Sequence, residues 1–574
     1  MSIYQKNLEI ISERFPYLYL LLLSKNTLVE KRKSLKLSNK NIFEKDLQSL
    51  DTLYIYKCLN IDLNLDVTNP DSHLDVTNPD LDLDLIQWIN EKDKKLIFLE
   101  DNLDDLNRFF HTKIAFDFLQ KQNVSFHFFK NIKDLDEITK KNLKANIDVV
   151  TFFKKTKKFE DLKQSIIEKS LISFFSNHDQ LFSYKMFKNF IKNIDKLKSS
   201  FLVNKFKNSL KDKPAIILGA GPSLNYSYEK LKTLSNKALI IAGGSAICST
   251  NQNIKPHLGV IIDPNLDEFK RLKNSLSFEM PMLFSTRVNS GVFNTFNSQT
   301  GYIKAAIGSF FEVWLDKELK ISGKYLQSKH DDLALSVTTI CVSLATLFGC
   351  NPIILDGVDL AYTEDKYYAS NIIDNTSIDN TSIDNTSIGN NLNKNQKDIG
   401  ERPYLTKNRN NKEVFSNLKW KIENKWLVTF AKKHKNTKFI NATKNGLKID
   451  FFEDLSIDEI EEKYLNESFD FEAYIHTLSQ ENMLTYAKTK DFKVLKLKLK
   501  NSFLNCKNYL LDILKNDPEY KAILAKEEIK DEIAYQYFLI EQNYTLKQFF
   551  ESDSKELIQN LLKVNDLFLK ECKI

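Results

Sequence analysis

Glycine and proline are both scarce in this sequence, with 14 and 11 among 574 residues. The six cysteines lie apart, and no Cys-x-x-Cys pair gives two of them a zinc-binding or redox spacing. We therefore expect reduced and mostly structural thiols. The sequence also lacks a His-Glu-x-x-His motif and a P-loop. These absences exclude the commonest signatures of zinc hydrolases and of P-loop nucleotide-binding proteins.

Long hydrophobic runs are missing as well. The most apolar stretch, residues 15–23, is far shorter than a membrane span, and the first residues lack the pattern of a signal peptide. The net charge of +6 results from 82 basic and 76 acidic residues, which is close to balance for a chain of this length. We therefore expect a cytoplasmic protein with no nucleic-acid partner and no membrane insertion.

The apolar content is nevertheless sufficient for several domains, since 42% of the residues are hydrophobic and 12% aromatic. The pattern predicts an α/β protein with an N-terminal α/β domain (1–200), a central Rossmann-like α/β domain (201–450) and an all-helical C-terminal domain (451–574). Apolar runs at 95–99 and 124–129 predict buried strands in the first of these. A low-complexity insert at 370–400 is too polar to bury a core, so we expect it to be disordered.

Three short apolar runs between residues 213 and 263 form the most informative stretch. Runs of this length, separated by helical segments, predict buried parallel strands. Ligands bind beyond the carboxyl ends of such strands, so the residues that follow each run are candidates for a ligand crevice. These are Gly219-Ala220-Gly221-Pro222-Ser223-Leu224 after the first run, Gly243-Gly244-Ser245 after the second, and Asp263-Pro264-Asn265 after the third.

The first of these turns predicts a phosphate or nucleotide site, because glycines let a backbone approach a ligand and helix amides attract an anion. The dinucleotide fingerprint is incomplete, since Leu224 stands where its third glycine belongs. The second run also lacks the acidic residue that binds the adenosine ribose, which argues against a nicotinamide cofactor. Tight packing of a strand against a helix is the alternative interpretation of the same glycines.

Further along the chain the pattern recurs. Residues 281–284 predict a fourth strand, and residues 331–348 predict a helix with Ser336 and Thr338 in its first turns. A further strand at 351–355 is followed by polar and small residues that extend the predicted crevice: Asp356, Gly357, Asp359 and Tyr362.

These segments, taken together and in this order, resemble the motility-associated factor (Maf) glycosyltransferase-like family of flagellated bacteria. The segments that carry the resemblance are residues 219–224, 243–245, 254–264, 351–362 and 441–446. The chain departs from the family pattern at Val358, where the family usually has a polar, glutamine-like residue, and in the long insert after Tyr362.

The resemblance implies an enzyme that moves a nonulosonic acid, of the pseudaminic or legionaminic type, from its cytidine monophosphate (CMP) donor to Ser or Thr of flagellin. Such a reaction is needed for flagellar assembly and motility. The resemblance also implies a central domain similar to bacterial sialyltransferases and a helical C-terminal domain that recognises flagellin. The CMP-activated sugar is a donor substrate, and the resemblance implies no other cofactor; a divalent metal bound through Asp263 or Asp359 is left open.

Each candidate residue has an assigned role in this hypothesis. The turn at 219–224 binds the donor phosphate, and residues 243–245 line the cytidine or sugar with Asp263 and Asn265. Asp359 and Asp356 are candidates for the general base that takes the proton of the acceptor hydroxyl. Ser336 and Thr338 are candidates for hydrogen bonds to a carboxylate or phosphate, while helix capping is the alternative role of these polar residues.

Two further functions stay open from the sequence. Part of the central domain is shared with pterin pyrophosphokinase-like transferases, which use ATP. A protein that binds flagellin during assembly without catalysis is the other alternative, because a fold does not establish an activity.

Overall fold

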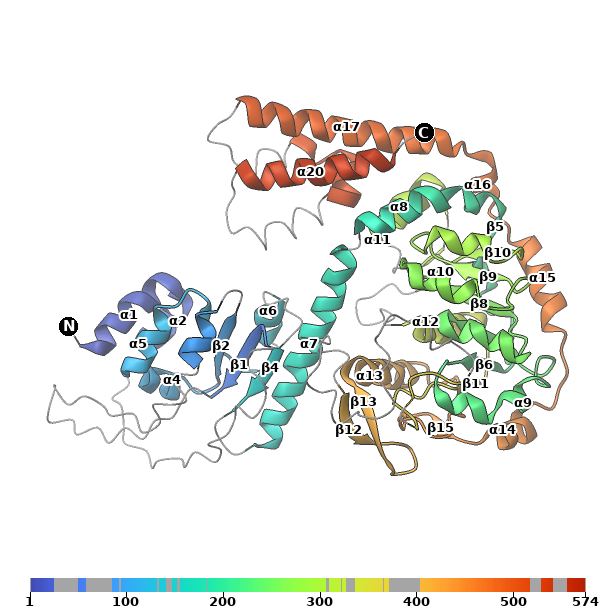
Figure 1. Ribbon diagram of the computed structural model, residues 1–574, viewed down its shortest axis with the longest axis horizontal. Coiled ribbons are helices and arrows are strands. Elements are labelled where there is room, and N and C mark those ends of the chain that lie inside the picture. Colours follow the sequence, from blue (N-terminus) through green and yellow to red (C-terminus); the bar gives the residue numbers. More distant parts are fainter. Residues whose placement is uncertain are drawn as a thin grey trace. The chain divides into compact units, whose positions relative to one another are not determined.

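The computed structural model contains two compact units, each built on a parallel β-sheet (Figure 1). The first unit contains residues 1–178, and the second contains residues 179–394 and 403–574. The predicted division into three domains stays a prediction. The structure describes residues 2–24, 50–57, 85–91, 94–131, 134–140, 147–151, 155–181, 183–305, 309–321, 323–326, 336–364, 366–370, 403–516, 528–539 and 555–572.

The first unit has a four-stranded, fully parallel sheet in the order β3-β2-β1-β4. Its buried faces are rich in aromatic residues, and Phe98 stacks on Phe126 with ring centroids 4.8 Å apart. The strands predicted at 95–99 and 124–129 are confirmed. The elements are α1 (Ile3–Arg14), α2 (Pro16–Ser24), β1 (Thr52–Tyr56), β2 (Lys95–Glu100), α4 (Leu103–Phe109), α5 (Lys113–Leu119), β3 (Val124–Phe128), α6 (Leu135–Lys140), β4 (Ile147–Val150) and α7 (Lys157–Leu181).

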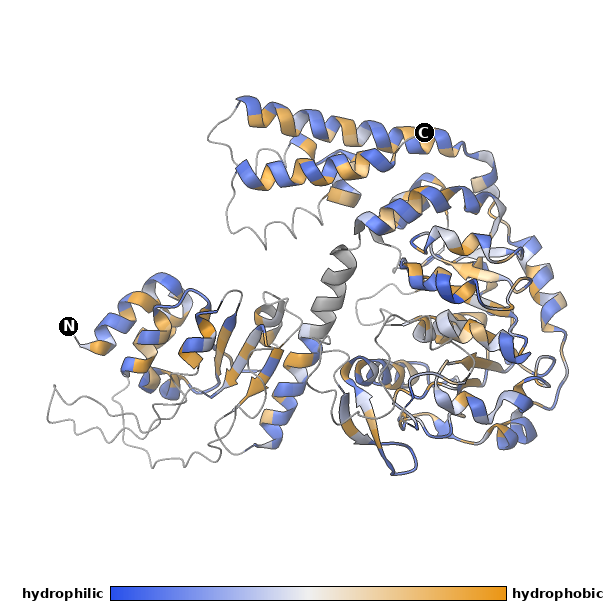
Figure 2. Cartoon of the chain, in the orientation of Figure 1, coloured by the Kyte–Doolittle hydropathy of each residue, from blue (hydrophilic) through white to orange (hydrophobic). Residues whose placement is uncertain are grey.

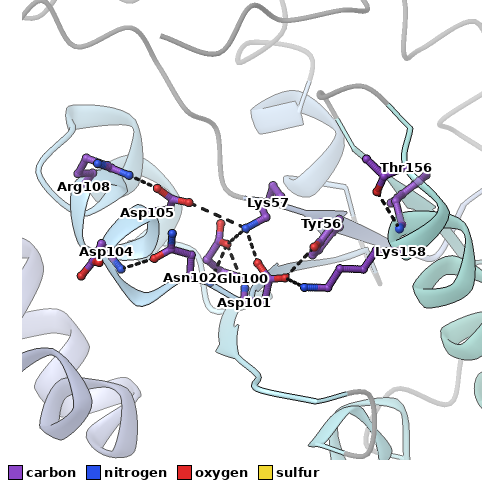
Figure 3. A network of polar contacts seen from close by, with 11 residues as sticks. Tyr56, Lys57, Glu100, Asp101, Asn102, Asp104, Asp105, Arg108, Thr156 and Lys158 are labelled. Atoms are coloured by element: carbon purple, nitrogen blue, oxygen red, sulfur yellow. Dashed lines mark hydrogen bonds and ion pairs between the residues drawn. The ribbon is translucent and has the colours of Figure 1, made fainter. Parts of the chain in front are cut away.

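The carboxyl ends of β1 and β2 meet in a network of ion pairs (Figure 3). Lys57, directly after β1, lies between the carboxylates of Glu100 and Asp101, and its Nζ is 2.8 Å from Glu100 Oε1. Tyr56 donates a hydrogen bond of 2.8 Å to Asp101, which also pairs with Lys158. The chain's own side chains therefore occupy this edge of the sheet.

Burial makes this network interdependent. The Glu100 side chain is fully buried, and burial raises its pKa to about 7 although Lys57 opposes the shift. Glu100 Oε1 also accepts the amides of Asp101 and Asn102, at 3.0 and 3.1 Å, at the start of α4. One buried carboxylate thus holds both a lysine and the beginning of a helix in place.

The second unit has a nine-stranded sheet in the order β15-β14-β11-β6-β7-β8-β9-β10-β5, in which every pair of neighbours is parallel. The chain passes from β6 outwards through β7 to β10, whereas β11, β14 and β15 lie on the other side of β6. The strand order therefore reverses between β6 and β11. The strands are β5 (Ser200–Leu202), β6 (Ala215–Leu218), β7 (Leu239–Gly243), β8 (Leu258–Ile261), β9 (Met282–Phe284), β10 (Thr300–Tyr302), β11 (Ile353–Asp356), β14 (Phe439–Asn441) and β15 (Glu453–Asp454).

Alternate residues of these strands belong to two separate hydrophobic cores, because successive side chains of a strand point to opposite faces. Ile216 and Ile240 pack on one face with α8, α10 and α11, and Ile217 and Ile241 pack on the other face with α12 and α13. Burial on both faces explains why the strands are continuous apolar runs. The covering helices are α8 (Ser183–Asn193), α9 (Tyr228–Leu231), α10 (Leu266–Leu272), α11 (Ser309–Glu318), α12 (Val337–Phe348) and α13 (Leu418–Lys433).

The remaining elements of the second unit are short 3-10 turns, an antiparallel ribbon and the C-terminal helices. The 3-10 turns are η4 (Ile194–Ser199), η5 (Val203–Phe206), η6 (Pro222–Tyr226), η7 (Gly244–Gln252) and η8 (Ser290–Asn294), and the ribbon pairs β12 (Pro403–Lys407) with β13 (Glu413–Asn417). The C-terminal part consists of α14 (Ile457–Tyr464), α15 (Phe471–Glu481), α16 (Thr485–Thr489), α17 (Phe492–Asn516), the π-turn η12 (Tyr535–Leu539) and α20 (Lys555–Glu571).

The α/β class and the helical character of the C-terminal part are thus confirmed. The prediction that residues 451–574 are all helical was wrong at β15, because Glu453–Asp454 pairs with β14 at the edge of the large sheet. The helical segment expected after β6 consists of η6 and α9, which are five and four residues long. Residues 371–400 of the predicted insert and residues 331–335 of the helix predicted at 331–348 lie outside the described residues. Among the helices that the structure describes, none is long and apolar enough to cross a membrane.

Candidate functional site

The carboxyl edge of the nine-stranded sheet gathers the residues that the sequence predicts for a site. The reversal of strand order between β6 and β11 puts the turn at 219–224 beside the loop at 356–362. Such a reversal opens a crevice in doubly wound α/β sheets because the two loops leave in opposite directions. In this protein the two loops are joined by backbone hydrogen bonds instead: the Gly219 and Gly221 amides donate to the carbonyls of Asp356 and Gly357, at 2.7 and 2.8 Å.

The two glycines permit this close approach. A Cβ at Gly219 would lie 2.1 Å from the Gly357 carbonyl oxygen, and a Cβ at Gly221 would lie 2.1 Å from Asp359 Oδ2. Gly357 itself has a φ of +69°, a conformation that other residues rarely adopt. These glycines therefore serve the packing of one loop on another.

The anion that the first turn binds in this structure is the carboxylate of Asp359. Asp359 Oδ1 accepts the hydroxyls of Ser223 and Thr363, each at 2.6 Å, and the Ser223 amide lies 3.2 Å from Oδ2. The Ser223 hydroxyl accepts the Asn445 amide in turn, at 3.0 Å. The carboxylate thus ties together the loops after β6, β11 and β14, and it is only 3% exposed.

Asp356 and Asp359 are both buried, and burial raises the pKa of each carboxyl group. The pKa of Asp356 rises to about 7, because of burial and of the nearby Asp359 charge. Among the described residues, Asp356 Oδ2 has no hydrogen-bond partner. A pKa near neutrality suits a general base, whereas the burial leaves neither carboxylate at the surface of the unbound protein. The assignment of a base to Asp359 or Asp356 stays a prediction.

Leu224 and Tyr362 lie in packed surroundings. Leu224 is fully buried in one hydrophobic core, which explains why a side chain stands where a dinucleotide fingerprint has glycine. Tyr362 is buried against Trp420 with ring centroids 4.8 Å apart. Pro222 begins η6 and is buried. The structure gives these three residues packing roles, and a direct ligand contact stays a prediction.

The ends of β7 and β8 are more open than those of β6 and β11. Gly243, Ser245, Asp263 and Asn265 are all partly exposed, unlike the buried loop at 356–360. Asp263 Oδ1 accepts the Asn265 amide at 2.9 Å, and the Asn265 side chain accepts Lys185 Nζ at 2.8 Å. The structure therefore brings four of the predicted residues together at a half-open edge.

The start of α12 lies against the turn after β7. A Cβ at Gly243 would lie 2.3 Å from Val337 Cγ1, so glycine is needed for this approach. Gly244 has a φ of +52° and lies between Val337 and the guanidinium of Arg271. The first turn of a twelve-residue helix and a cation therefore flank the same glycine.

Ser336 and Thr338 begin this helix. Ser336 is the N-cap of α12: its hydroxyl accepts the Thr339 amide at 3.2 Å and also donates to Glu423 Oε1 at 2.5 Å. The capping alternative is thus confirmed for Ser336. Thr338 is partly exposed in the first turn, and its contact with a ligand stays a prediction.

Arg271, like Lys185, is a cation at this edge that the sequence did not single out. Its side chain is partly exposed, donates to the buried Glu268 at 3.2 Å and lies 3.9 Å from Asp263 Oδ2. Burial is the largest influence and lowers the pKa of the Arg271 guanidinium, but Glu268, Tyr368, Asp263 and Asp267 together raise this pKa above its ordinary value. A single arginine near the end of an amphipathic helix carries no sequence signal that separates it from a solvated residue.

Glu268 accepts a hydrogen bond from the Arg271 guanidinium. The carboxyl group is 1% exposed, and burial raises its pKa to about 8. Burial thus favours the protonated form of Glu268, whereas the neighbouring Arg271 guanidinium favours the carboxylate. A fixed guanidinium beside a glycine turn and a helix start suits a phosphate or carboxylate group.

The chain beyond Tyr362 folds back over the first turn. The Ala369 amide donates to the Ala220 carbonyl at 2.9 Å, and the Ser370 amide donates to Asn225 Oδ1 at 2.9 Å. Tyr368, in the same segment, is close enough to Arg271 to influence its pKa. The half-open edge is therefore bounded by β7, β8, α12 and this segment.

His257 and the hollows of the surface lie away from this edge. His257 precedes β8, and its Nδ1 accepts the Ile240 amide at 2.9 Å, which gives the imidazole a structural role.

A shallow hollow of about 480 Å³ lies at the amino ends of β11 and β14, lined by residues such as Asn351, Lys438 and Glu453. Among the described residues, no group of three or more His, Cys, Asp or Glu is placed to hold a metal ion.

Comparisons with known proteins identify similar chains. Residues 188–365 match a family model described as "6-hydroxymethylpterin diphosphokinase MptE-like", and this segment includes the site from Gly219 to Tyr362. No curated protein matches the sequence. Among solved structures, the chain is similar to a MAf glycosyltransferase from Magnetospirillum magneticum AMB-1, with a TM-score of 0.46 and 12% identity over 100% of this chain and 97% of that chain.

Proposed function

We propose that this chain is a glycosyltransferase that moves a nonulosonic acid, of the pseudaminic or legionaminic type, from a CMP-activated donor to Ser or Thr of flagellin. The ordered set of Maf-like segments supports this assignment, and they meet at the carboxyl edge of one parallel sheet. In this proposal the central part is a sialyltransferase-like fold, and the reaction takes place in the cytoplasm and serves flagellar assembly and motility.

The observation that carries the proposal is the position of Arg271 beside Gly244 at the half-open edge. A CMP-activated nonulosonic acid has two anionic groups, a phosphodiester and a carboxylate, and a fixed guanidinium binds either of them in a bidentate way. The amides of the turn at 219–224 are already bound to the chain itself. We therefore assign the donor anion to Arg271 and the turn after β7.

The reaction requires three events at the donor. The acceptor hydroxyl oxygen forms a bond to the anomeric carbon, the bond from that carbon to the phosphate oxygen breaks, and the hydroxyl proton passes to a base. Positive charge develops on the sugar and negative charge on the leaving CMP, so a fixed cation at the phosphate stabilises the transition state. Asp359 and Asp356 are the proposed bases, and their burial keeps their pKa high enough to accept a proton.

The test is the intact mass of unglycosylated flagellin after incubation with this protein and either CMP-pseudaminic or CMP-legionaminic acid. We expect stepwise additions of one nonulosonic acid with one of the two donors. Arg271→Gln is expected to reduce the rate by about ten- to a hundredfold, since a hydrogen bond to a charged group contributes about 1.5–3 kcal/mol. Lys270→Gln is the matched control, because Lys270 is the neighbouring, more exposed cation on α10.

The variants separate the parts of the proposal. Full activity in Asp359→Asn would exclude Asp359 as the base, and full activity in Arg271→Gln would exclude the anion assignment. Absence of any mass addition by the folded wild type, with both donors and the acceptor verified, would reject the transferase.

The match to the pterin diphosphokinase-like family favours a second candidate, a transferase that uses ATP. Thermal stabilisation by ATP but not by CMP would support this candidate, because a ligand of the native state raises the melting temperature. Binding of flagellin without binding of either nucleotide would support the third candidate, a non-catalytic assembly factor.

A further inference from the structure

Helix α17 has two apolar faces, and among the described residues only one of these faces is buried. Its inner face packs against α20 and α8: Phe503 lies 5.8 Å from the ring of Phe568 and 5.7 Å from that of Phe187, and the Phe503 carbonyl accepts Asn565 at 3.1 Å. Figure 1 shows α17 and α20 side by side. The buried residues of this face are Phe492, Leu495, Leu499, Ser502, Phe503, Cys506 and Leu510.

The outer face carries a second aliphatic stripe. Val494, Leu497, Leu504 and Leu511 are 59%, 44%, 37% and 47% exposed. Their separations of three and seven residues place them on one side of the helix, opposite the buried face. Figure 2 shows the resulting alternation of hydrophobic and hydrophilic residues along α17. A surface helix that packs on one neighbour needs only one such stripe.

The spacing of this outer stripe is that of a coiled coil. Leu497, Leu504 and Leu511 recur every seven residues and take the d positions of a heptad. The intervening a positions hold Asn501 and Asn508, both exposed. Val494 takes the first a position, so the apolar seam consists of Val494 and the leucines at d. Asparagine at a fixes the register of a helix pair at a cost in stability.

The charges beside the stripe are of one sign on one flank. Lys493, Lys500 and Lys507 also recur every seven residues and take the g positions. Lys507 pairs with Asp566 at 2.8 Å and remains partly exposed. Residues at g contact the flank of the partner helix in a coiled coil, so acidic residues on the partner would be favourable and basic residues unfavourable.

We propose that the outer face of α17 is a docking surface for an amphipathic helix of a partner protein, with an aliphatic stripe and acidic residues beside it. The leucines at d supply the apolar contact, the asparagines at a set the register, and the lysines at g select for acidic partners. The proposal does not depend on the transferase reaction, since α17 contributes no residue to the site at the carboxyl edge.

A second copy of this chain fits the surface less well. In an antiparallel pair of α17 helices, g positions face g positions, which would oppose lysines to lysines. In a parallel pair, Lys493 would face Lys498, a repulsion that only the pair of Lys507 and Asp512 offsets. An acidic helix of another protein meets neither repulsion.

The test measures binding of a fluorescent peptide of about three heptads, with leucine at a and d and glutamate at e and g, to the full-length protein. We expect binding of this peptide and at least about tenfold weaker binding when lysine replaces its glutamates. Leu497→Glu with Leu504→Glu is expected to weaken binding of the acidic peptide by about tenfold or more. Leu276→Glu is the control, because Leu276 is an exposed leucine, at 59%, that lies outside α17.

The charge selection has its own test. Lys493→Glu with Lys500→Glu changes surface residues only, and we expect the preference to reverse in favour of the basic peptide. Equal binding of both peptides by the wild type, or unchanged binding by the leucine variant, would overturn the proposal. Sedimentation that shows a dimer of the chain, abolished by the leucine variant, would assign the surface to a second copy instead.

Discussion

The two sheets of this protein both end their strands in polar residues, yet their carboxyl edges are filled in different ways. In the first unit, the side chains of Lys57, Glu100 and Asp101 bind one another. In the second unit, the backbones of Gly219 and Gly357 approach each other closely. Arg271 and Gly244 lie at the half-open edge beside this contact, at the ends of β7 and β8. No glycine precedes Gly219 in the whole sequence.

This difference shows when polar residues at the end of a strand indicate a ligand site. Without glycine, neither a backbone nor a ligand can come close to the strand ends, and long side chains occupy the space. In the second unit, the glycines let two loops pack tightly at Gly219 and Gly357, and the polar residues after β7 and β8 stay partly exposed. Acidic and basic residues at the end of a parallel strand therefore indicate a ligand site only where small residues leave room for the ligand.

The largest expected effect comes from adding a side chain at the contact between Gly219 and Gly357. Gly219→Ala places a Cβ against the rigid Gly357 carbonyl, so we expect a loss of about 3 kcal/mol or more in the free energy of unfolding in urea. Gly259→Ala on β8 is the control: its nearest atoms belong to the flexible side chains of Met280 and Met282, and we expect a smaller loss. Equal losses would contradict a special role of the loop contact.

The next effect tests the ion pairs of the first sheet. Lys57→Met leaves the fully buried Glu100 without its cation, and we expect a loss of about 2–3 kcal/mol because Lys57 is itself partly exposed. Lys57→Met combined with Glu100→Gln removes both charges and should recover most of this stability. Urea unfolding of these two variants and of Glu100→Gln alone gives the coupling energy; independent losses from the two substitutions would show that the pair does not act as a unit.

The smallest effect concerns pH and Glu268. The folded state holds the Glu268 proton up to a pKa of about 8, above the ordinary glutamate value of 4.5, so the folded state binds more protons between these values. Stability contributed by this proton is complete below about pH 4.5 and is lost as the pH rises through about 8. We expect Glu268→Gln to reduce the fall in stability between about pH 5.5 and 7.5 by about 1–2 kcal/mol. Parallel pH profiles of the two proteins would contradict this.

The sequence predicted much of the fold and part of the site. The apolar runs that became β6, β7, β8 and β11 are continuous because both of their faces are buried, and that pattern is local. The residues that follow these strands were predicted as site residues because their position directly after an apolar run is also a local pattern. The helical segment expected after Gly219 consists of a short 3-10 turn and a four-residue helix, and the buried Leu224 of the turn packs against Gly357.

What the sequence could not show depends on pairs far apart in the chain. The Ser223 hydroxyl and Asp359 carboxylate are separated by 136 residues, and nothing local marks them as partners. Arg271 has the same limitation, because a helical arginine acquires its role only from the Gly244 turn that lies beside it.

The sequence by itself therefore determined the parallel strands, the glycines at their ends and the heptads of α17, because each is a periodic or local property of the chain. Only the tertiary structure decided that Asp359 fills the first turn, that Arg271 stands beside the open edge and that one face of α17 is uncovered. The physical reason is that a contact between distant segments depends on how whole elements pack, and the local pattern of either segment carries no record of that packing.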